Sequence, residues 1–343
     1  MSDFDYELPE ELIAQVPLAD RTASRLLVLN RSNKSISHES FRSLHSHLNP
    51  GDLLVVNDSR VLPARVIGRR STGGEVEFLL LSEVSPRQWR CLMRPARKLK
   101  IGERIEVERR EGSTEASLIT VIEKEDEGQG IVELAPDLAE NLGSFGRVPL
   151  PPYIHAHLED DERYQTVYSR VRGSAAAPTA GLHFTQEALA QLQAAGVGLA
   201  AVTLHVGLDT FRPVTVDYAE DHRIHSEWCS VDEDAARAIA DTRAAGGRVI
   251  AVGTTAARTL ESYARQPEAE AGEPFSGMTD IYITPGYKWR LVDAMVTNFH
   301  LPKSTLLLML SSFAGKDLLF EAYRQAIEQR YRFFSFGDAM FVY

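Results

Sequence analysis

The sequence has few of the features that mark secreted, membrane-bound or disulfide-stabilised proteins. Only two of its 343 residues are cysteine, Cys91 and Cys229, so we expect no disulfide framework and a reducing cytosol. The first residues are acidic and lack the apolar run of a secretory signal. The apolar run at residues 306–310 is far shorter than the ~20 residues that span a bilayer. We therefore expect a cytoplasmic protein without a membrane partner.

Familiar nucleotide-binding motifs are also missing. No G-x-G-x-x-G follows a predicted strand, and the pattern G-x-x-x-x-G-K-[ST] does not occur. These absences argue against a dehydrogenase, a P-loop enzyme and an ordinary methyltransferase. The chain also lacks an excess of positive charge, because its formal net charge is −11. Taken alone, that charge argues against a nucleic-acid partner.

Positive charge is nevertheless concentrated in residues 60–110. This segment holds thirteen Lys and Arg residues and six Glu residues, giving +7 and leaving −18 for the rest of the chain. Such a segment can bind a polyanion locally, while the charge of the whole protein limits non-specific association. A solvated, Arg-rich β surface explains the same composition equally well.

The apolar pattern changes twice along the chain. Between residues 64 and 147, short alternating runs are separated by turns, which predicts a small antiparallel β-barrel. After residue 185, helix and strand patterns alternate, which predicts an α/β domain with a largely parallel sheet. We therefore expect a discontinuous main α/β domain of residues 1–63 and 148–343, with the β-barrel of residues 64–147 inserted into it.

Individual elements of the main domain follow from buried runs and capping residues. We expect strands at residues 26–29, 53–56, 201–206, 248–252 and 280–284, and helices at 186–195, 232–244, 304–313 and 318–330. A helix ending at Tyr263 should follow the Gly-Thr-Thr sequence at 253–255.

Polar residues follow four of the predicted strands, at the carboxyl ends where open α/β sheets bind ligands. They are Asp58 and Arg60 after the strand at 53–56, His205 in the strand at 201–206, Thr254, Thr255 and Arg258 after the strand at 248–252, and Asn298 and His300 after the extended stretch at 291–298. Helix capping and a buried core histidine are the competing explanations for single residues. A cluster at four strand ends favours a binding site.

The segment at 176–185, A-A-P-T-A-G-L-H-F-T, is the most unusual in the chain. Gly181 and the alanines would let a ligand approach the backbone closely. Thr179 and His183 supply polar groups, Phe184 supplies a ring face, and Thr185 caps a helix whose N-terminus favours anions. A tight turn needed only for packing is the alternative.

A metal site is a further alternative, because His222, His225 and Glu227 lie close together in the sequence. A zinc site needs three or four convergent ligands. These residues lack the i, i+4 spacing of a helical site, and Cys91 and Cys229 do not form a pair of ligands. We therefore expect polar loop histidines and no metal, and a metal-dependent hydrolase stays as a second candidate function.

Long strings in the chain lead to a specific family. They lie at residues 3–9, 57–61, 164–168, 176–185, 203–210, 225–227, 253–255, 285–287, 297–302 and 331–340. Over nearly the full length, these strings resemble the S-adenosylmethionine:tRNA ribosyltransferase-isomerases of queuosine biosynthesis. Two departures are Ala175, where the family usually has Val, and Asp209, where Gly is commoner.

The resemblance implies a reaction between S-adenosylmethionine, as ribosyl donor, and tRNA that carries 7-aminomethyl-7-deazaguanine at the wobble position. Its products are epoxyqueuosine in tRNA, adenine and methionine. The resemblance also implies an α/β main domain with an inserted barrel, no metal, and a monomer. A non-catalytic RNA-binding protein is the third candidate, but it leaves the 176–185 segment unexplained.

The implied chemistry needs a general base, a general acid and a dry pocket. Histidine is the natural proton carrier near neutral pH. We expect these roles for His183 and His205 first and His300 third, with Glu227 or Asp58 either holding such a histidine or facing the sulfonium.

Substrate contacts are expected from the remaining candidates. Phe184 would stack on adenine or contact the sulfonium through its ring face. The methionine carboxylate would be bound by Thr254, Thr255 and Arg258. Residues 60–110 would contact tRNA phosphates. The other expected substrate-binding residues are Arg60, Thr179, Gly181, Thr185 and Asn298.

Overall fold

A computed structural model describes residues 1–110, 116–207, 216, 218–222 and 224–343. Asp209 and the end of the 203–210 string lie outside these residues. The chain divides into a main unit of Met1–Ser59, Pro152–Val171 and Ala177–Tyr343 and a barrel unit of Arg60–Pro151 and Arg172–Ala176. The domain boundaries expected from the sequence stay a prediction.

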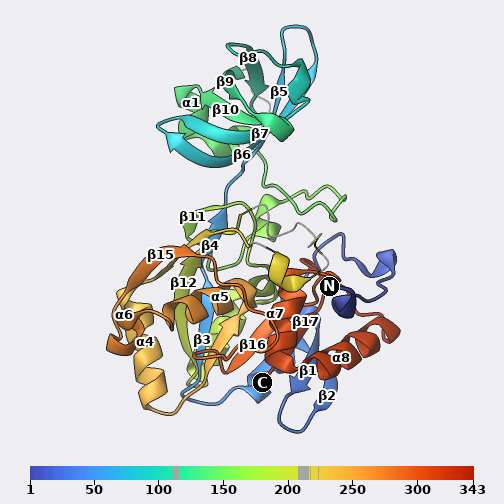
Figure 1. The fold of residues 1–343 in the computed structure, drawn as a ribbon, viewed down its shortest axis with the longest axis vertical. Coiled ribbons are helices and arrows are strands. Elements are labelled where there is room, and N and C mark those ends of the chain that lie inside the picture. Colours follow the sequence, from blue (N-terminus) through green and yellow to red (C-terminus); the bar gives the residue numbers. More distant parts are fainter. Residues whose placement is uncertain (111–115, 208–215, 217, 223) are drawn as a thin grey trace. The chain divides into compact units, whose positions relative to one another are not determined.

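The main unit contains a mixed sheet of nine strands among the described residues, in the order β15-β13-β12-β3-β14-β16-β17-β1-β2 (Figure 1). The strands are β1 (Arg25–Asn30), β2 (Ser35–Ser40), β3 (Leu53–Asn57), β12 (Gly198–Leu204), β13 (Glu227–Val231), β14 (Val249–Val252), β15 (Phe275–Thr279), β16 (Ala294–Asn298) and β17 (Ala339–Val342). Strands β12, β3, β14 and β16 are parallel neighbours at the centre. Both flanks contain antiparallel pairs. The predicted α/β class is confirmed; the parallel pairs are those in the middle of the sheet and β17–β1 on one flank.

Strand β3 shows how the parallel centre of the sheet is buried. All five of its residues are buried, as expected of a strand covered on both faces. Leu53 and Val55 belong to one core, with residues of helices α4, α5, α7 and α8. Leu54 and Val56 belong to a second core, with residues of helix α3. One apolar run therefore supplies both faces of the sheet.

The helices of the main unit lie close to their predicted positions. They are α3 (Gln186–Ala194), α4 (Glu233–Ala244), α5 (Gly253–Tyr263), α6 (Pro267–Ala271), α7 (Thr305–Ala314) and α8 (Lys316–Glu328), with 3-10 turns at Ser2–Phe4, Glu10–Leu12, Arg21–Ala23, Phe41–His47, Asp161–Tyr164, Thr179–His183 and Ala219–Asp221. Thr185, Asp232 and Ser304 cap α3, α4 and α7 through their side chains. Helix α5 has no side-chain cap. No helix in the described part of the chain is both long enough and apolar enough to cross a membrane.

One strand prediction was wrong. Residues 280–284 form no strand, and β15 lies just before them. The Ile281 backbone N–H bonds the hydroxyl of Thr279 at 3.3 Å. Ile281 and Ile283 are buried in the core of the main unit. Their alternation therefore reflects packing of an extended segment and not pairing in the sheet.

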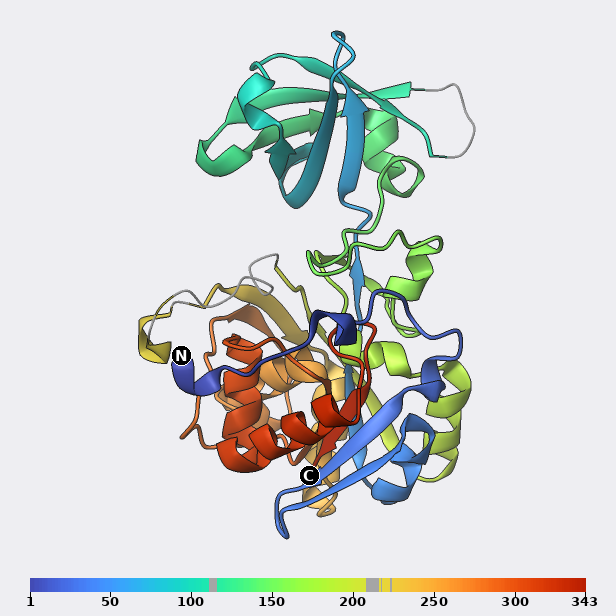
Figure 2. The ribbon, with the colours of Figure 1, turned by 90° about the vertical axis from the view of Figure 1, so that its right-hand side faces the viewer.

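The barrel unit contains a closed antiparallel barrel in the order β10-β7-β6-β5-β8-β9 (Figure 2). Its elements are β5 (Arg65–Arg69), β6 (Glu75–Ser85), β7 (Gln88–Arg94), β8 (Arg104–Glu108), β9 (Ala116–Lys124) and β10 (Gln129–Leu134), with short helices α1 (Pro136–Glu140) and α2 (Leu142–Phe145) and 3-10 turns at Ala96–Lys98 and Asp126–Gly128. Strands β4 (Ser59–Val61) and β11 (Val171–Ser174) form a separate pair. Alternate residues such as Val76 and Phe78 fill the barrel interior. The predicted barrel is confirmed.

Candidate active site

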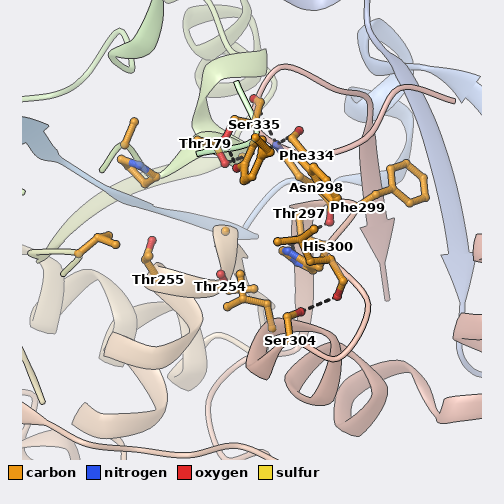
Figure 3. Close-up of a pocket in the computed structure, with 18 residues that line it drawn as sticks. Thr179, Thr254, Thr255, Thr297, Asn298, Phe299, His300, Ser304, Phe334 and Ser335 are labelled. Carbon is orange, nitrogen blue, oxygen red and sulfur yellow. Dashed lines mark hydrogen bonds between the residues drawn. The ribbon is translucent and has the colours of Figure 1, made fainter. Parts of the chain in front are cut away.

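A cavity that is partly open to solvent lies where the central strands of the main sheet end (Figure 3). We call it cavity A. It is lined by Tyr153, Ala177, Pro178, Thr179, Ala180, Val206, Gly253, Thr254, Thr255, Thr297, Asn298, Phe299, His300, Leu301, Ser304, Leu306, Phe334 and Ser335. Its walls thus combine the unusual 176–185 segment with the residues that follow β14 and β16.

Helix α5 begins at cavity A. Gly253, Thr254 and Thr255 form its first turn and line the cavity. Gly253 has φ +89°, and an added Cβ would lie 3.4 Å from Ala180 Cβ, so a tight, left-handed backbone joins β14 to the helix. Because no side chain caps α5, its first N–H groups are available to an acceptor. The buried Thr255 Oγ1 also lacks a hydrogen-bond partner among the residues that the structure describes.

Asn298 links cavity A to the buried His183. Its Nδ2 donates to Phe334 O at 2.9 Å and lies 3.5 Å from Thr179 Oγ1. The amide oxygen therefore faces His183 Nε2 at 3.1 Å. His183 Nε2 must carry the proton, and Nδ1 accepts from Ser24 Oγ at 2.8 Å. Both ring nitrogens of His183 are engaged, so this neutral imidazole orients Asn298.

Burial keeps two histidines of this region neutral. It lowers the pKa of His183 from 6.5 to about 4, although the hydrogen bond to Asn298 opposes the shift. Burial alone lowers the pKa of His300 to about 3. His300 lines cavity A, and its Nε2 bonds Thr297 Oγ1 at 2.9 Å. A neutral imidazole at the cavity wall can accept a proton.

His205 lies just beyond the end of β12. Its ring stacks on Trp228 with centroids 5.2 Å apart, and its buried Nδ1 has no hydrogen-bond partner in the described part of the chain. Burial lowers its pKa, and the charge of Asp58 opposes that shift. Its neighbours in the chain, Val206 and Gly207, line cavity A and a second cavity.

This second cavity, cavity B, is also partly open to solvent. It is lined by Gly207, His222, Ile224, His225, Ser226, Glu227, Arg258, Ile281, Tyr282, Ile283, Thr305, Leu306 and Met309. Leu306 lines both cavities. Helix α5 supplies Thr254 and Thr255 to cavity A and, one turn later, Arg258 to cavity B.

A buried ion pair lies in the wall of cavity B. Arg258 Nη1 bonds Glu227 Oε2, and each side chain is only 6% exposed. Glu227 Oε1 accepts the Gly207 N–H at 2.8 Å. Among the described residues, the buried Nε and Nη2 atoms of Arg258 and the buried hydroxyl of Tyr282 have no hydrogen-bond partner. Cavity B therefore presents a charged group whose hydrogen bonds are incomplete.

Comparisons with known proteins identify the family. A sequence model of the family described as Queuosine biosynthesis protein matches residues 1–342. The chain belongs to this family. It is also similar to the crystal structure of an S-adenosylmethionine tRNA ribosyltransferase from Thermotoga maritima, at 39% sequence identity and a TM-score of 0.58. That match covers 99% of this chain and 100% of the other. The family expected from the sequence is confirmed.

The structure brings together only some of the residues that the sequence suggested for this family member. Thr179, Thr254, Thr255, Asn298 and His300 line cavity A, and Glu227 and Arg258 line cavity B. Thr254, Thr255 and Arg258, which were expected to bind one carboxylate, are divided between the two cavities.

Three other candidates are not among the residues that line the two cavities. Asp58 Oδ2 accepts from Arg170 at 2.8 Å, and its Oδ1 accepts from Thr203 at 2.7 Å. Thr185 caps α3 by accepting the Ala188 N–H at 3.1 Å. Arg60 belongs to the barrel unit.

Phe184 and Gly181 are packing residues in this structure. Phe184 is 0% exposed and packs edge to face with Phe41, with ring centroids 4.9 Å apart. Its ring has no face open to cavity A, which argues against the expected contact with adenine or the sulfonium. A Cβ on Gly181 would lie 1.9 Å from Tyr168 Oη. Gly181 thus allows Tyr168 to approach the backbone.

Sequence reasoning missed several wall residues. Tyr153 Oη and Ser335 Oγ are 2.7 Å apart beside cavity A, and burial raises the pKa of Tyr153 to about 12. Tyr282 and Met309 of cavity B were missed as well. Tyr153 lies in the proline-rich segment before residue 185 and Ser335 in the 331–340 string, so both had a signal that was not used.

Proposed function

We propose that this chain transfers and isomerises the ribosyl group of S-adenosylmethionine onto 7-aminomethyl-7-deazaguanine in tRNA, releasing adenine and methionine. The products are then epoxyqueuosine-tRNA, adenine and methionine. Membership of the queuosine biosynthesis family supports this proposal. The similarity to the Thermotoga maritima S-adenosylmethionine tRNA ribosyltransferase supports it further.

The observation that carries the proposal is the pair of adjoining cavities in the main unit. Both are lined by α5 and by Leu306, and both contain buried polar atoms without partners, at Thr255 and Arg258. A buried polar group left unpaired costs about 1–3 kcal/mol. A protein can retain unpaired groups of this kind where a bound ligand supplies the missing hydrogen-bond partners. S-adenosylmethionine matches two compartments, because a nucleoside and an amino acid are joined at its sulfur.

The reaction can be written so that atoms and charges balance. A base removes a proton from the ribose 5′ carbon, which the neighbouring sulfonium acidifies. The C4′–O4′ bond breaks to give a vinyl sulfonium, and O4′ forms a carbonyl at C1′ as adenine leaves and receives a proton. The aminomethyl nitrogen adds to C4′ and loses a proton, the ylide so formed at C5′ bonds to the carbonyl carbon C1′, and the resulting alkoxide displaces methionine from C5′ as the epoxide closes. The enzyme has to move these protons and stabilise the departing adenine.

Side chains at cavity A suit these tasks. Burial lowers the pKa of His300 to about 3, which weakens it as a base, so His205 is our first candidate for the general base and His300, which lines cavity A, is the second. The first turn of α5 carries partial positive charge, which stabilises negative charge that develops on departing adenine. The hydroxyl of Thr255 adds a donor there. His183 acts as a positioning residue, through its bond to Asn298.

For tRNA we propose contacts with a defined part of the basic segment. Exposed cations lie between the end of β7 and the start of β8, at Arg94, Arg97, Lys98, Lys100 and Arg104. None of these five forms an ion pair with a described residue. By contrast, Arg70 bonds Glu103 at 2.6 Å and Arg90 bonds Glu125 at 2.6 Å. The first group remains free to neutralise phosphates.

The decisive experiment incubates purified protein with S-adenosylmethionine and measures adenine and methionine release. We expect both products in equal amounts when tRNA carries 7-aminomethyl-7-deazaguanine. Neither should form when the tRNA carries guanine at that position. Release without the modified base, or binding of tRNA without any release, contradicts the proposal, and the latter result indicates an RNA-binding protein.

The metal-dependent hydrolase has less support. Glu227 is bonded to Arg258 and to the Gly207 N–H. Within the described residues, no three His, Cys, Asp or Glu side chains converge as metal ligands. Stoichiometric zinc or manganese in the purified protein, together with activity that chelators abolish, contradicts the assignment. The monomeric state and the cytoplasmic location remain predictions, and light scattering after gel filtration tests the first.

A further inference from the structure

Resting on the proposed function, we propose that cavity B is an amino-acid subsite, in which Arg258 binds the carboxylate of the methionine part of S-adenosylmethionine. Cavity A then holds the nucleoside part. The sulfonium lies near Leu306, which lines both cavities. This division departs from the expectation that Thr254, Thr255 and Arg258 bind one carboxylate together.

The unpartnered edge of Arg258 indicates a carboxylate. Nε and Nη2 of a guanidinium form two parallel donors that match two oxygens. Arg248 uses this edge on Asp52, at 3.1 and 2.5 Å. Arg70 uses it on Glu103, at 2.6 and 3.2 Å. In Arg258 the same two nitrogens are buried and have no partner among the described residues, whereas Nη1 bonds Glu227.

The rest of cavity B fits an amino acid. Glu227 places a carboxylate beside Arg258. The wall of cavity B therefore carries a negative and a positive group, which are complementary to the α-ammonium and the α-carboxylate of an amino acid. The buried hydroxyl of Tyr282 is a further group without a partner. Ile281, Ile283 and Met309 add apolar surface, against which the methylene groups of methionine can pack.

The modified base fits the edge of Arg258 less well. Arginine reads guanine through its O6 and N7 acceptors. A 7-deazaguanine has carbon at position 7 and offers only one of the two. A backbone phosphate is bulkier, and the Arg258 side chain is 6% exposed. A carboxylate at the end of a flexible chain reaches such a group more easily.

The test measures binding without tRNA, by titration calorimetry on the full chain. The probes are L-methionine, L-methioninamide, which lacks the carboxylate, and 5′-methylthioadenosine, which lacks the amino acid. The variant is Arg258→Lys, which keeps the charge and loses the planar fork. Its matched control is Arg248→Lys, the same change at a bidentate pair whose residues line neither cavity.

For the wild-type protein, we expect methioninamide to bind roughly 10- to 100-fold more weakly than methionine. Arg258→Lys should weaken methionine to a similar extent and bring the two ligands within about threefold of each other. The variant should bind methylthioadenosine as the wild type does. Arg248→Lys should leave all three affinities within about twofold.

Equal binding of methionine and methioninamide to the wild type overturns the proposal, and this result needs no variant to fold. So does an equal loss of methionine and methylthioadenosine in Arg258→Lys. Adenine release with modified tRNA is measured separately. If the protein releases adenine but its binding of methionine does not depend on Arg258, the subsite is contradicted and the proposed function is not. Arg258-dependent methionine binding without turnover contradicts the proposed function alone.

Discussion

The two ends of the parallel strands in the main sheet use the same kinds of residue differently. At the amino ends, Asp52 precedes β3 and accepts four hydrogen bonds, from Asn49 N and from the backbone and guanidinium of Arg248. Asp293 precedes β16 and accepts the Val249 N–H at 2.8 Å. Each carboxylate ties neighbouring strands together, so polarity at this end serves the fold.

At the carboxyl ends, several polar groups are buried but incompletely bonded. Within the described residues, Thr255 Oγ1, His205 Nδ1 and two nitrogens of Arg258 have no partner. Such groups destabilise the folded protein, by about 1–3 kcal/mol for each unpaired buried donor or acceptor. The contrast separates residues that hold the sheet together from residues that await a ligand. It predicts loss of stability from substitution at one end and loss of binding or turnover at the other.

The largest expected effect is on stability at the amino ends. Asp52→Ala leaves the Arg248 guanidinium and two backbone N–H groups without their acceptor, so we expect the free energy of unfolding to fall by about 3 kcal/mol or more. Urea titration followed by circular dichroism measures this change. At temperatures where the variant is folded, kcat/KM should match the wild type. A stable variant with impaired turnover breaks the comparison.

The second effect is a loss of stability in acid, caused by the histidines at the carboxyl ends. The pKa of His183 is lowered to about 4 and that of His300 to about 3. Between pH 6.5 and these values, the unfolded chain takes up protons that the folded chain does not. Their contribution is therefore present above pH 6.5 and lost as the pH falls. We expect a loss of ~2 kcal/mol for each histidine between pH 7 and pH 5.

Urea titrations at several pH values measure this dependence. His183→Gln should remove one histidine's share of the slope and keep the other. An unchanged slope in this variant means that His183 does not differ from an exposed histidine, which contradicts its buried, neutral state.

A smaller effect concerns the carboxyl end itself. Thr255→Val removes a buried hydroxyl that has no partner, so stability should be unchanged or rise by up to about 1 kcal/mol. Turnover should fall about tenfold in kcat/KM for S-adenosylmethionine, because a donor to the substrate is lost. The matched control is Thr259→Val on the same helix, where the hydroxyl already bonds Thr255 O at 3.0 Å. There we expect the reverse, a loss of stability with normal turnover.

The smallest effects are expected in the barrel unit. There the comparison is between surface cations that are paired with a carboxylate and surface cations that are not. Lys100→Ala and Arg97→Ala should each weaken tRNA binding roughly two- to fivefold and reduce its salt slope by about one. Arg90→Ala removes a cation already paired with Glu125 and should change both less. Fluorescence anisotropy at several salt concentrations measures the difference. Equal effects at Lys100 and Arg90 show that pairing does not select the phosphate contacts.

Much of the fold could be predicted because it rests on local patterns. The run at 53–56 is apolar at every position, which indicates a strand buried on both faces, and Thr185 marks the start of α3 as a capping residue. The alternation of Val76, Phe78 and Leu80 indicates a barrel with one face inward. The strand expected at 280–284 failed because Ile281 and Ile283 alternate for packing while the Ile281 N–H bonds a side chain.

The site was less predictable, because burial and partners are set by distant parts of the chain. His183 and His300 look equivalent in the sequence, yet His183 is bonded at both ring nitrogens and His300 lines cavity A. Phe184 resembles a stacking residue until Phe41, 143 positions earlier in the sequence, packs against its ring. Tyr153 and Ser335 lie 182 positions apart and meet at one cavity wall.

By itself, the sequence determined the family, the class of both folds and the strand ends at which polar residues gather, because periodicity, caps and long identical strings are local. Only the tertiary structure decided which of those residues are satisfied and which are not. Hydrogen-bond partners come from elsewhere in the chain, and Arg248 and Arg258 show the consequence. Arg248 lies just before β14 and Arg258 in α5, yet one meets a carboxylate of the protein on its Nε–Nη2 edge and the other has no partner there among the described residues.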